Sequence, residues 1–226
     1  MFTEILETRR FLSVTLQPGP QPDYATVTQD NNGNVTISAQ KQKKTAGGSK
    51  VAGGSKAMVL NVAVQEDNGS LTVTEIQTGA TWTVDGATSV KINGTKNADN
   101  IFYTDTTIGA SITGGSGADT IVVADTGTGS SNIDSGNGND SINLLVGNNT
   151  HIKAGGGDDT VSLNSGVGVY NTAASTAIVD MGGGNDIALV YAGQADVNGA
   201  GGHDNAIVFV SNGASANVTD ADVTFA

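Results

Sequence analysis

Six aspartates in the second half of the chain each close a short glycine-rich segment, and their spacing is nearly constant. The gaps between them are 20, 21, 19, 27 and 18 residues, at Asp99, Asp119, Asp140, Asp159, Asp186 and Asp204. If each gap is one coil of a stacked structure, the carboxylates form a file. Two carboxylates about 5 Å apart repel by roughly 1 kcal/mol in water and about 3 kcal/mol at an effective dielectric constant of 20. A hard dication between successive turns removes this repulsion, and Ca²⁺, which takes six to eight oxygen ligands, suits the pattern better than Mg²⁺.

A second column of residues shows which elements must position these aspartates. Its members are apolar and repeat with gaps of 20, 21, 19, 27, 18 and 21, at Ile92, Ile112, Ile133, Ile152, Val179, Val197 and Val218. The two columns drift together, as one structural coil per repeat requires. After each aspartate the apolar residues alternate, as at Ile121 and Val123, so they share one face of a strand. About twenty residues cannot bury a core alone, but coils stacked about 4.8 Å apart can, which predicts an all-β, parallel β-solenoid.

The composition excludes several other classes of protein. The chain has 226 residues with 32 glycines, three prolines and no cysteine, so disulfide frameworks and thiolate metal sites are excluded. Its net charge is −12, and residues 97–226 contain fourteen aspartates but one basic residue, Lys153. Such an acidic half repels nucleic acid and anionic membranes. No apolar run approaches the roughly 18 residues of a membrane span. The two histidines, His151 and His203, form no catalytic triad at a recognisable spacing, so we expect no enzyme.

The first part of the chain is organised differently. We expect an N-terminal extension over residues 1–56, with a hairpin turning at Asn32-Gly33 and a basic, Gly/Ser-rich linker over residues 41–56. The solenoid is expected to fill residues 57–226. Alternating segments between residues 59 and 93 are interpreted as further coils that lack the glycine turn. The long fourth gap predicts an insertion within residues 166–175.

The glycine–aspartate segments resemble a known repeat. GGSGADTIV at residues 114–122 fits the nonapeptide G-G-x-G-x-D-x-U-x of the RTX, or haemolysin-type, calcium-binding repeats. SGNGNDSIN (135–143) and AGGGDDTVS (154–162) differ only at the first glycine, whereas MGGGNDIAL (181–189), GAGGHDNAI (199–207) and GTKNADNIF (94–102) are looser. The resemblance covers residues 94–207. It implies a right-handed β-roll that binds several Ca²⁺ ions and folds outside the cell.

The resemblance also implies the ligands. The six turn aspartates would bind Ca²⁺ together with main-chain carbonyl oxygens of Gly114, Ser116, Ala118, Asn137, Asn139, Gly156, Asp158, Gly183, Asn185, Gly201 and His203. RTX coils usually have a nonapeptide at both edges, whereas the second turn of each coil here lacks it, as in ADTGTGSSNID. We therefore expect one metal-bearing edge. A metal-free reading also remains open, because Gly-Asn-Asp turns in solenoids can be simple Asx turns.

Two short segments bear on location. LETRRFLS near the start resembles the L-E-x-R-x-L-S box of some bacterial surface proteins, and DADVTFA at the end resembles uncleaved secretion signals of the RTX family. Together with the repeats they favour an extracellular or cell-surface location. We expect a secreted structural protein whose folding or assembly depends on Ca²⁺ and which self-associates end to end into fibres or through its N-terminal strands. The alternatives are a calcium-dependent carbohydrate-active β-solenoid enzyme and an ice- or carbohydrate-binding adhesion module.

Overall fold

The computed structural model describes residues 13–20, 24–40, 59–67, 69–105, 107–125, 130–146, 149–163, 176–210 and 215–225. Within these ranges the chain forms strands and turns and has no helix, and so none that could cross a membrane. The predicted linker and insertion fall outside the described residues, and so does the LETRRFLS segment except for its last residue, Ser13. DADVTFA overlaps the last strand described.

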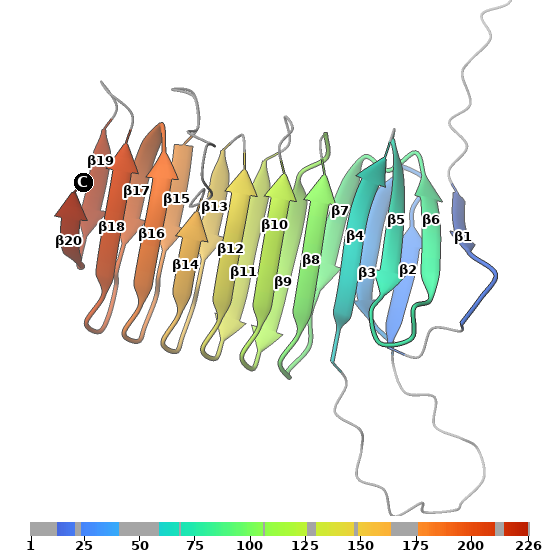
Figure 1. Ribbon diagram of the computed structural model, residues 1–226, viewed down its shortest axis with the longest axis horizontal. Coiled ribbons are helices and arrows are strands. Elements are labelled where there is room, and N and C mark those ends of the chain that lie inside the picture. Colours follow the sequence, from blue (N-terminus) through green and yellow to red (C-terminus); the bar gives the residue numbers. More distant parts are fainter. Residues whose placement is uncertain are drawn as a thin grey trace, which may run out of the picture.

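The strands lie in two sheets that face each other across the core (Figure 1). In hydrogen-bonded order, the eleven-stranded sheet contains β1 (Ser13–Leu16), β6 (Thr81–Asp85), β5 (Ser70–Glu75), β4 (Asn61–Asp67), β8 (Asn100–Asp105), β10 (Thr120–Asp125), β12 (Ser141–Val146), β14 (Thr160–Leu163), β16 (Ile187–Ala192), β18 (Asn205–Val210) and β20 (Asp222–Phe225). The nine-stranded sheet contains β19 (Ala216–Thr219), β17 (Gln194–Asn198), β15 (Thr176–Asp180), β13 (Thr150–Lys153), β11 (Ser131–Asn137), β9 (Ala110–Ser116), β7 (Ser89–Asn93), β3 (Asn34–Ala39) and β2 (Ala25–Gln29).

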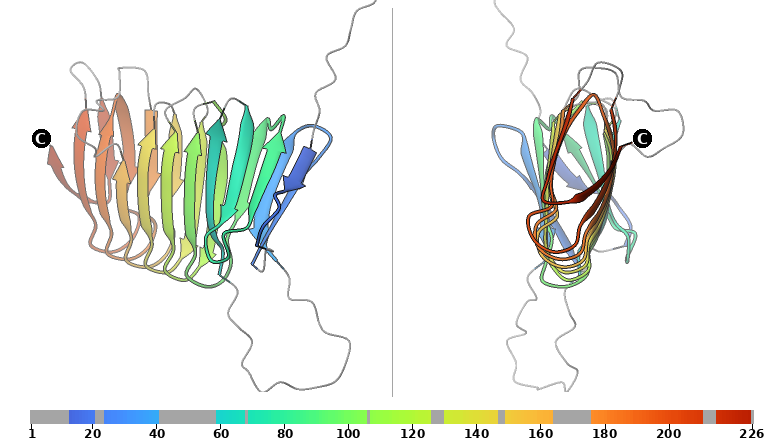
Figure 2. Two further views of the ribbon diagram at one scale, coloured as in Figure 1. Left: turned by 45° about the vertical axis from the view of Figure 1, so that its right-hand side comes forward. Right: turned by 90° about the vertical axis from the view of Figure 1, so that its left-hand side faces the viewer.

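From β8 onward the chain alternates between the two sheets, and every neighbouring pair is parallel. The register follows the repeat: Ile121 pairs with Ile101 on one side and Ile142 on the other, and Ile133 lies between Ile112 and Ile152. The end-on view shows the coils superimposed along the long axis (Figure 2). The predicted all-β, parallel β-solenoid with an N-terminal β-rich extension is therefore confirmed.

The core is a stack of aliphatic layers. The inward residues of successive strands are almost fully buried, as at Ile121, Ile142 and Val161, and they pack against the second column, which includes Ile112 and Ile152. Alternation along each strand gives this result directly, because residues two apart point to the same side. Tyr103 is the one buried tyrosine of the core cluster, and its hydroxyl donates to the carbonyl of Ile108 (2.5 Å).

The N-terminal end differs from the sequence interpretation. Residues 59–93 were expected to be further coils, but β4, β5 and β6 form an antiparallel meander, with β1 added antiparallel to β6. Only β4 and β7 stack as coil strands, parallel to β8 and β9. The predicted hairpin is present as β2 and β3, which turn at Gly33 (φ 84°), and β3 pairs in parallel with β7. The chain reverses at Gly69 (φ 81°) and Gly79 (φ 75°), so these strands pair antiparallel at the end of the solenoid instead of forming stacked coils.

Candidate functional site

The six aspartates lie inside the narrow turns that join the two sheets, where they form one buried ladder. Their side chains are at most 3% exposed. Each main-chain N–H donates to Oδ1 of the next aspartate along the solenoid: Asp99 to Asp119 (2.7 Å), Asp119 to Asp140 (2.8 Å), Asp140 to Asp159 (2.7 Å), Asp159 to Asp186 (2.7 Å) and Asp186 to Asp204 (2.9 Å). The structure thus stacks all six predicted residues in a single file.

The ladder is bounded at both ends by residues without a carboxylate. The pairing of Asn61 with Asn100 places Leu60 beside Asp99, and the N–H of Leu60 donates to Asp99 Oδ1 (2.5 Å). At the other end the pairing of Asn205 with Asp222 places Ala221 beside Asp204. The carboxylate file therefore coincides with the part of the solenoid that has glycine-rich turns.

Glycine is required in these turns because the main chains of successive turns nearly touch. At Gly136 φ is 102°, and a Cβ would lie 2.2 Å from the carbonyl oxygen of Gly115. At Gly182 φ is 90°, and a Cβ would lie 1.9 Å from the carbonyl oxygen of Gly155. Left-handed backbone and this contact both exclude ordinary side chains. The close approach holds successive aspartates one above the other.

One oxygen of most ladder carboxylates has no partner. Oδ2 is buried and makes no hydrogen bond in Asp119, Asp140, Asp159, Asp186 and Asp204. Asp99 is different, because its Oδ2 accepts the N–H of Thr95 and its Oδ1 also accepts the Thr95 hydroxyl (3.0 Å). A buried acceptor left unpaired costs about 1–3 kcal/mol, and more when it is charged. Five turns therefore contain an oxygen that a cation or a proton would stabilise.

The residue five positions before each aspartate determines what lies beside Oδ2. A Cβ placed on Gly114 would be 2.5 Å from Asp119 Oδ2 and 2.5 Å from the carbonyl oxygen of Ser135. At Gly199 the corresponding distances are 2.6 Å to Asp204 Oδ2 and 2.1 Å to the carbonyl oxygen of Asp220. No side chain could be accommodated at these two positions, so glycine here lets a main-chain carbonyl oxygen of the next turn approach the carboxylate.

The three middle turns carry side chains at this position. Ser135, Ala154 and Met181 precede Asp140, Asp159 and Asp186 by five residues, and all three are fully buried. The Ser135 hydroxyl donates to the carbonyl of Ala154 (2.6 Å) and adds an oxygen to its turn. The side chains of Ala154 and Met181 supply carbon only. By the oxygen donors described near the ladder, the turns of Asp119, Asp140 and Asp204 suit Ca²⁺ better than those of Asp159 and Asp186.

Burial is the main electrostatic effect on the ladder. Burial, with a smaller contribution from the neighbouring carboxylates, raises the pKa of Asp119 and that of Asp159 to about 7, although each accepts a main-chain N–H that lowers it. Burial also raises the pKa of Asp99, Asp140 and Asp186, and hydrogen bonds from main-chain N–H groups offset part of the effect. A raised pKa means that the surrounding groups do not fully offset the free-energy cost of burying the ionised carboxylate.

The predicted carbonyl ligands divide into three groups. Gly114 and Ser116 form the first group. The carbonyl oxygen of Gly114 lies 2.0 Å from where a Cβ on Gly94 would be. Four carbonyls accept an N–H from the preceding turn at 2.7–2.8 Å, in Asn137, Gly156, Gly183 and Gly201. The last group belongs to exposed residues on the rim of the turns: Ala118, Asn139, Asp158, Asn185 and His203. The structure thus gathers the aspartates more closely than their predicted carbonyl partners.

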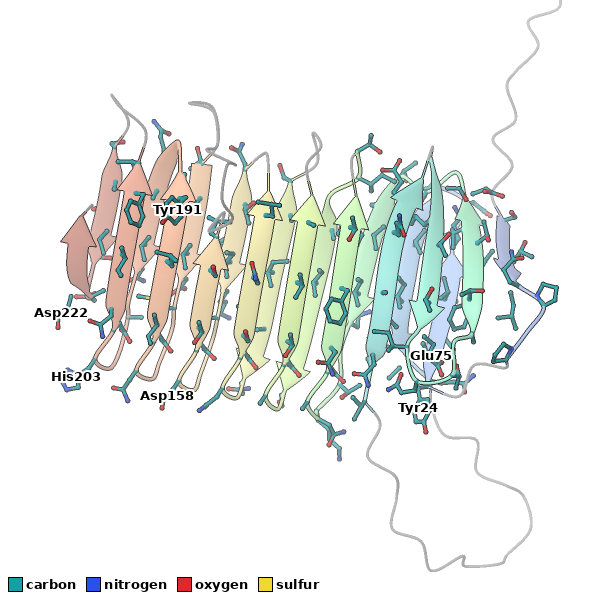
Figure 3. All side chains as sticks on the ribbon, viewed as in Figure 1. Tyr24, Glu75, Asp158, Tyr191, His203 and Asp222 are labelled. Atoms are coloured by element: carbon teal, nitrogen blue, oxygen red, sulfur yellow. The ribbon has the colours of Figure 1, made fainter. Side chains whose placement is uncertain are left out.

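Sequence reasoning missed a second ladder on the rim. Oδ1 of Asn139 accepts the N–H of Asp158 (3.1 Å), Asp158 Oδ1 accepts that of Asn185 (2.8 Å), and Asn185 Oδ1 accepts that of His203 (3.1 Å). Asp158 and His203 lie at the exposed turns (Figure 3). The sequence feature that could have revealed this rim ladder is the column of short polar residues directly before the ladder aspartates. It shows that this turn geometry accepts either Asn or Asp as a stacking acceptor.

A second buried carboxylate was also missed. Glu75 is fully buried at the N-terminal end, and its Oε2 accepts the N–H groups of Tyr24 (3.0 Å) and Ala25 (2.9 Å). Thr78 donates its hydroxyl to Oε1 (2.8 Å). Glu75 therefore ties β5 of one sheet to β2 of the other, and its acceptors are satisfied by protein groups (Figure 3). Nothing in the repeat pattern could have identified it.

The remaining chemistry-bearing groups are dispersed. Across the described ranges, no three side chains of His, Cys, Asp or Glu come together closely enough to hold a metal ion, so any cation in a turn would depend on main-chain oxygens. His151 is exposed on β13 and His203 in a turn, so the two rings lie on different elements. No family model, curated protein or solved structure matches the chain.

Proposed function

We propose that the chain is an extracellular structural β-solenoid that takes up Ca²⁺ in its glycine–aspartate turns and is stabilised by it. The observation that carries the proposal is the buried, unpartnered Oδ2 of Asp119 and Asp204, each in a turn where glycine lets a carbonyl oxygen of the next turn approach the carboxylate. A divalent cation bound to such oxygens would neutralise the file of carboxylates. The resemblance to RTX repeats supports the choice of Ca²⁺ and a location where Ca²⁺ is abundant.

Binding would act on folding through mass action. Extracellular modules bind Ca²⁺ with dissociation constants of about 0.1–1 mM. A site with a Kd of 0.1 mM at the low end of that range gains about 1.4 kcal/mol in about 1 mM Ca²⁺, since the term is RT ln(1 + [L]/Kd). Two or three such sites shift the folding equilibrium by several kcal/mol. The role of the chain is then mechanical, as a surface or matrix component, and it requires no catalytic group.

Calcium titration of the unfolding equilibrium tests the proposal. We expect the urea midpoint of the full chain, followed by circular dichroism, to rise with Ca²⁺ and to return to its starting value with EGTA. Asp119→Asn should reduce this rise, because it removes the charge that the ion would neutralise. Asp158→Asn is the matched control, since Asp158 is an exposed carboxylate on the rim of the turn that ends at Asp159. A midpoint that ignores Ca²⁺, or an equal loss in both variants, would contradict the proposal.

Strand edges favour end-to-end assembly as a second part of this function. β20 and β19 are the last strands of their sheets, and each is hydrogen-bonded on one side only within the described chain. Free edges pair readily with other strands, and a head-to-tail contact of this kind generates a filament. Electron microscopy with and without Ca²⁺ tests it, and monodisperse particles in millimolar Ca²⁺ would rule it out.

A further inference from the structure

The two outer faces of the solenoid differ in charge. On the nine-stranded sheet the outward positions include Lys91, Asp134, Lys153, Asp180 and Asp196. On the eleven-stranded sheet, the outward positions that the structure describes between β8 and β18 carry Asn, Thr, Ser and apolar side chains and no charged one. In a chain with a net charge of −12 this flat face is a neutral surface.

Apolar side chains gather on this neutral face over β16 and β18. Leu189 is paired with Ile207 and Tyr191 with Phe209, and the two rings stack with centroids 4.2 Å apart and planes at 4°. Ile187 is 54% exposed and Ile207 is 39% exposed. Figure 3 looks onto this face and shows Tyr191 on β16. These five residues are called the outer apolar cluster.

The apolar volume of these two coils has moved from the core to the surface. The inward position two residues after the ladder aspartate is Ile or Val in the earlier coils, as at Ile121 and Val161, but it is Ala188 in β16 and Ala206 in β18. The outward residue just before this position becomes larger in β16, where Ile187 replaces the threonine of β10 and β14. A coil that served only to fill the core would keep the large residue inside. The exchange places large apolar side chains on the outer face of these two coils, where Ile187 and Ile207 are exposed.

We propose that the outer apolar cluster and the neutral face around it bind the same face of a second copy of this chain. The net charge of −12 makes two copies repel each other, and this repulsion is smallest where the faces that meet carry no charge. Sheets pack face to face at about 10 Å, as in a sandwich. A contact between identical faces is isologous and closes at the dimer. The proposal does not depend on Ca²⁺ in the turns.

The size of the face sets the expected affinity. From β8 to β18, strand spacing of about 4.8 Å and a rise of about 3.3 Å per residue give a projected area of about 500 Å². This is below the roughly 800 Å² that each partner buries in a standard interface. A contact of this size is typical of weak, transient association, so the dimer should be reversible.

Sedimentation velocity of the full chain from about 1 µM to 1 mM, in EGTA, tests the proposal. We expect a monomer–dimer equilibrium that Ile207→Lys weakens at least tenfold. Ile178→Lys is the matched control, because Ile178 is 43% exposed at the centre of β15 on the opposite face. Ile187→Thr provides a milder variant, which restores the threonine of β10 and β14 at that position and should also weaken the dimer.

Three outcomes would overturn the proposal: a wild-type chain that stays monomeric over this range, equal weakening by Ile178→Lys, or a monomer that uses Ile207 to bind a polysaccharide or a lipid vesicle instead. Filaments from free strand edges are distinguishable, because they grow beyond the dimer and do not require Ile207. Since the experiment is done in EGTA, failure of the calcium proposal leaves its result unchanged.

Discussion

Asp119→Asn should stabilise the metal-free protein at neutral and higher pH. Asparagine keeps the Oδ1 acceptor for the N–H of Asp99, and its neutral amide nitrogen replaces the unpaired, charged Oδ2. Burial raises the pKa of Asp119 from 3.8 to about 7. A difference of about 3 pH units at 1.36 kcal/mol each gives about 4 kcal/mol as the upper limit for the cost of the charged form.

The sign of the pH dependence follows from the raised pKa. The folded state binds more protons than the unfolded state between pH 3.8 and about 7, so wild-type stability falls as the pH rises through this window. Above it the cost of the charge is fully present, and below pH 3.8 it is absent. The gain from Asp119→Asn should therefore be large near pH 8 and small near pH 4.

Urea unfolding in EDTA at several pH values measures this gain. Asp158→Asn controls for a general loss of negative charge, because its carboxylate is exposed in the adjacent rim ladder. If Asp119→Asn is less stable than wild type near pH 8 in EDTA, the buried carboxylate is not a charge liability in the metal-free fold. The ladder would then have no unfavourable charge for a cation to neutralise.

Other changes test the turn and the N-terminal closure. Gly182→Ala should cost more than about 1–2 kcal/mol, because its backbone is left-handed and its Cβ would lie 1.9 Å from a carbonyl oxygen. Gly183→Ala, where a Cβ meets nothing within 4 Å, should stay within about 0.5 kcal/mol of wild type; equal effects on the urea midpoint would refute this account of the turns. Glu75→Ala removes the acceptor of two main-chain N–H groups and should cost about 2–4 kcal/mol. Hydrogen exchange should then show the loss of protection in β2 before β12, and uniform loss would contradict a local role for Glu75.

The repetitive half of the fold could be predicted because each residue type there has one physical task. Glycine permits the close turn, aspartate begins the strand, and the alternating apolar residues fill the core, so two columns with equal gaps fix the register from Ile92 to Val197. The N-terminal meander could not be predicted in this way. An alternating strand such as β5 has the same pattern whether it stacks in parallel or pairs antiparallel, and Glu75, which helps to decide the outcome, acts on Tyr24 and Ala25 fifty residues away.

The candidate site was predictable to a similar extent. The spacing predicted that the six aspartates lie in one file, and the structure stacks them in that way. What the nonapeptide did not show is that its first position changes the oxygen atoms available near the ladder. Gly114 and Gly199 let a carbonyl oxygen of the next turn approach the carboxylate, and Ser135 adds a hydroxyl, whereas Ala154 and Met181 add only carbon. The variation at this position, treated as a minor mismatch to the motif, therefore changes the donors that an ion would find in each turn.

The two ladders of the turn bear on why the inner one is made of aspartate. On the rim, Asn139 and Asn185 accept N–H groups through Oδ1 in the same way as Asp158 does. Stacking alone is therefore satisfied by a neutral side chain, which avoids repulsion between neighbours. The inner ladder makes the same hydrogen bonds but has aspartate at all six positions, where burial makes the charge most costly. Hydrogen bonding cannot account for this choice, since asparagine would serve it better. The second oxygen and its negative charge are what aspartate adds, and a cation in the turns is the partner that would use both.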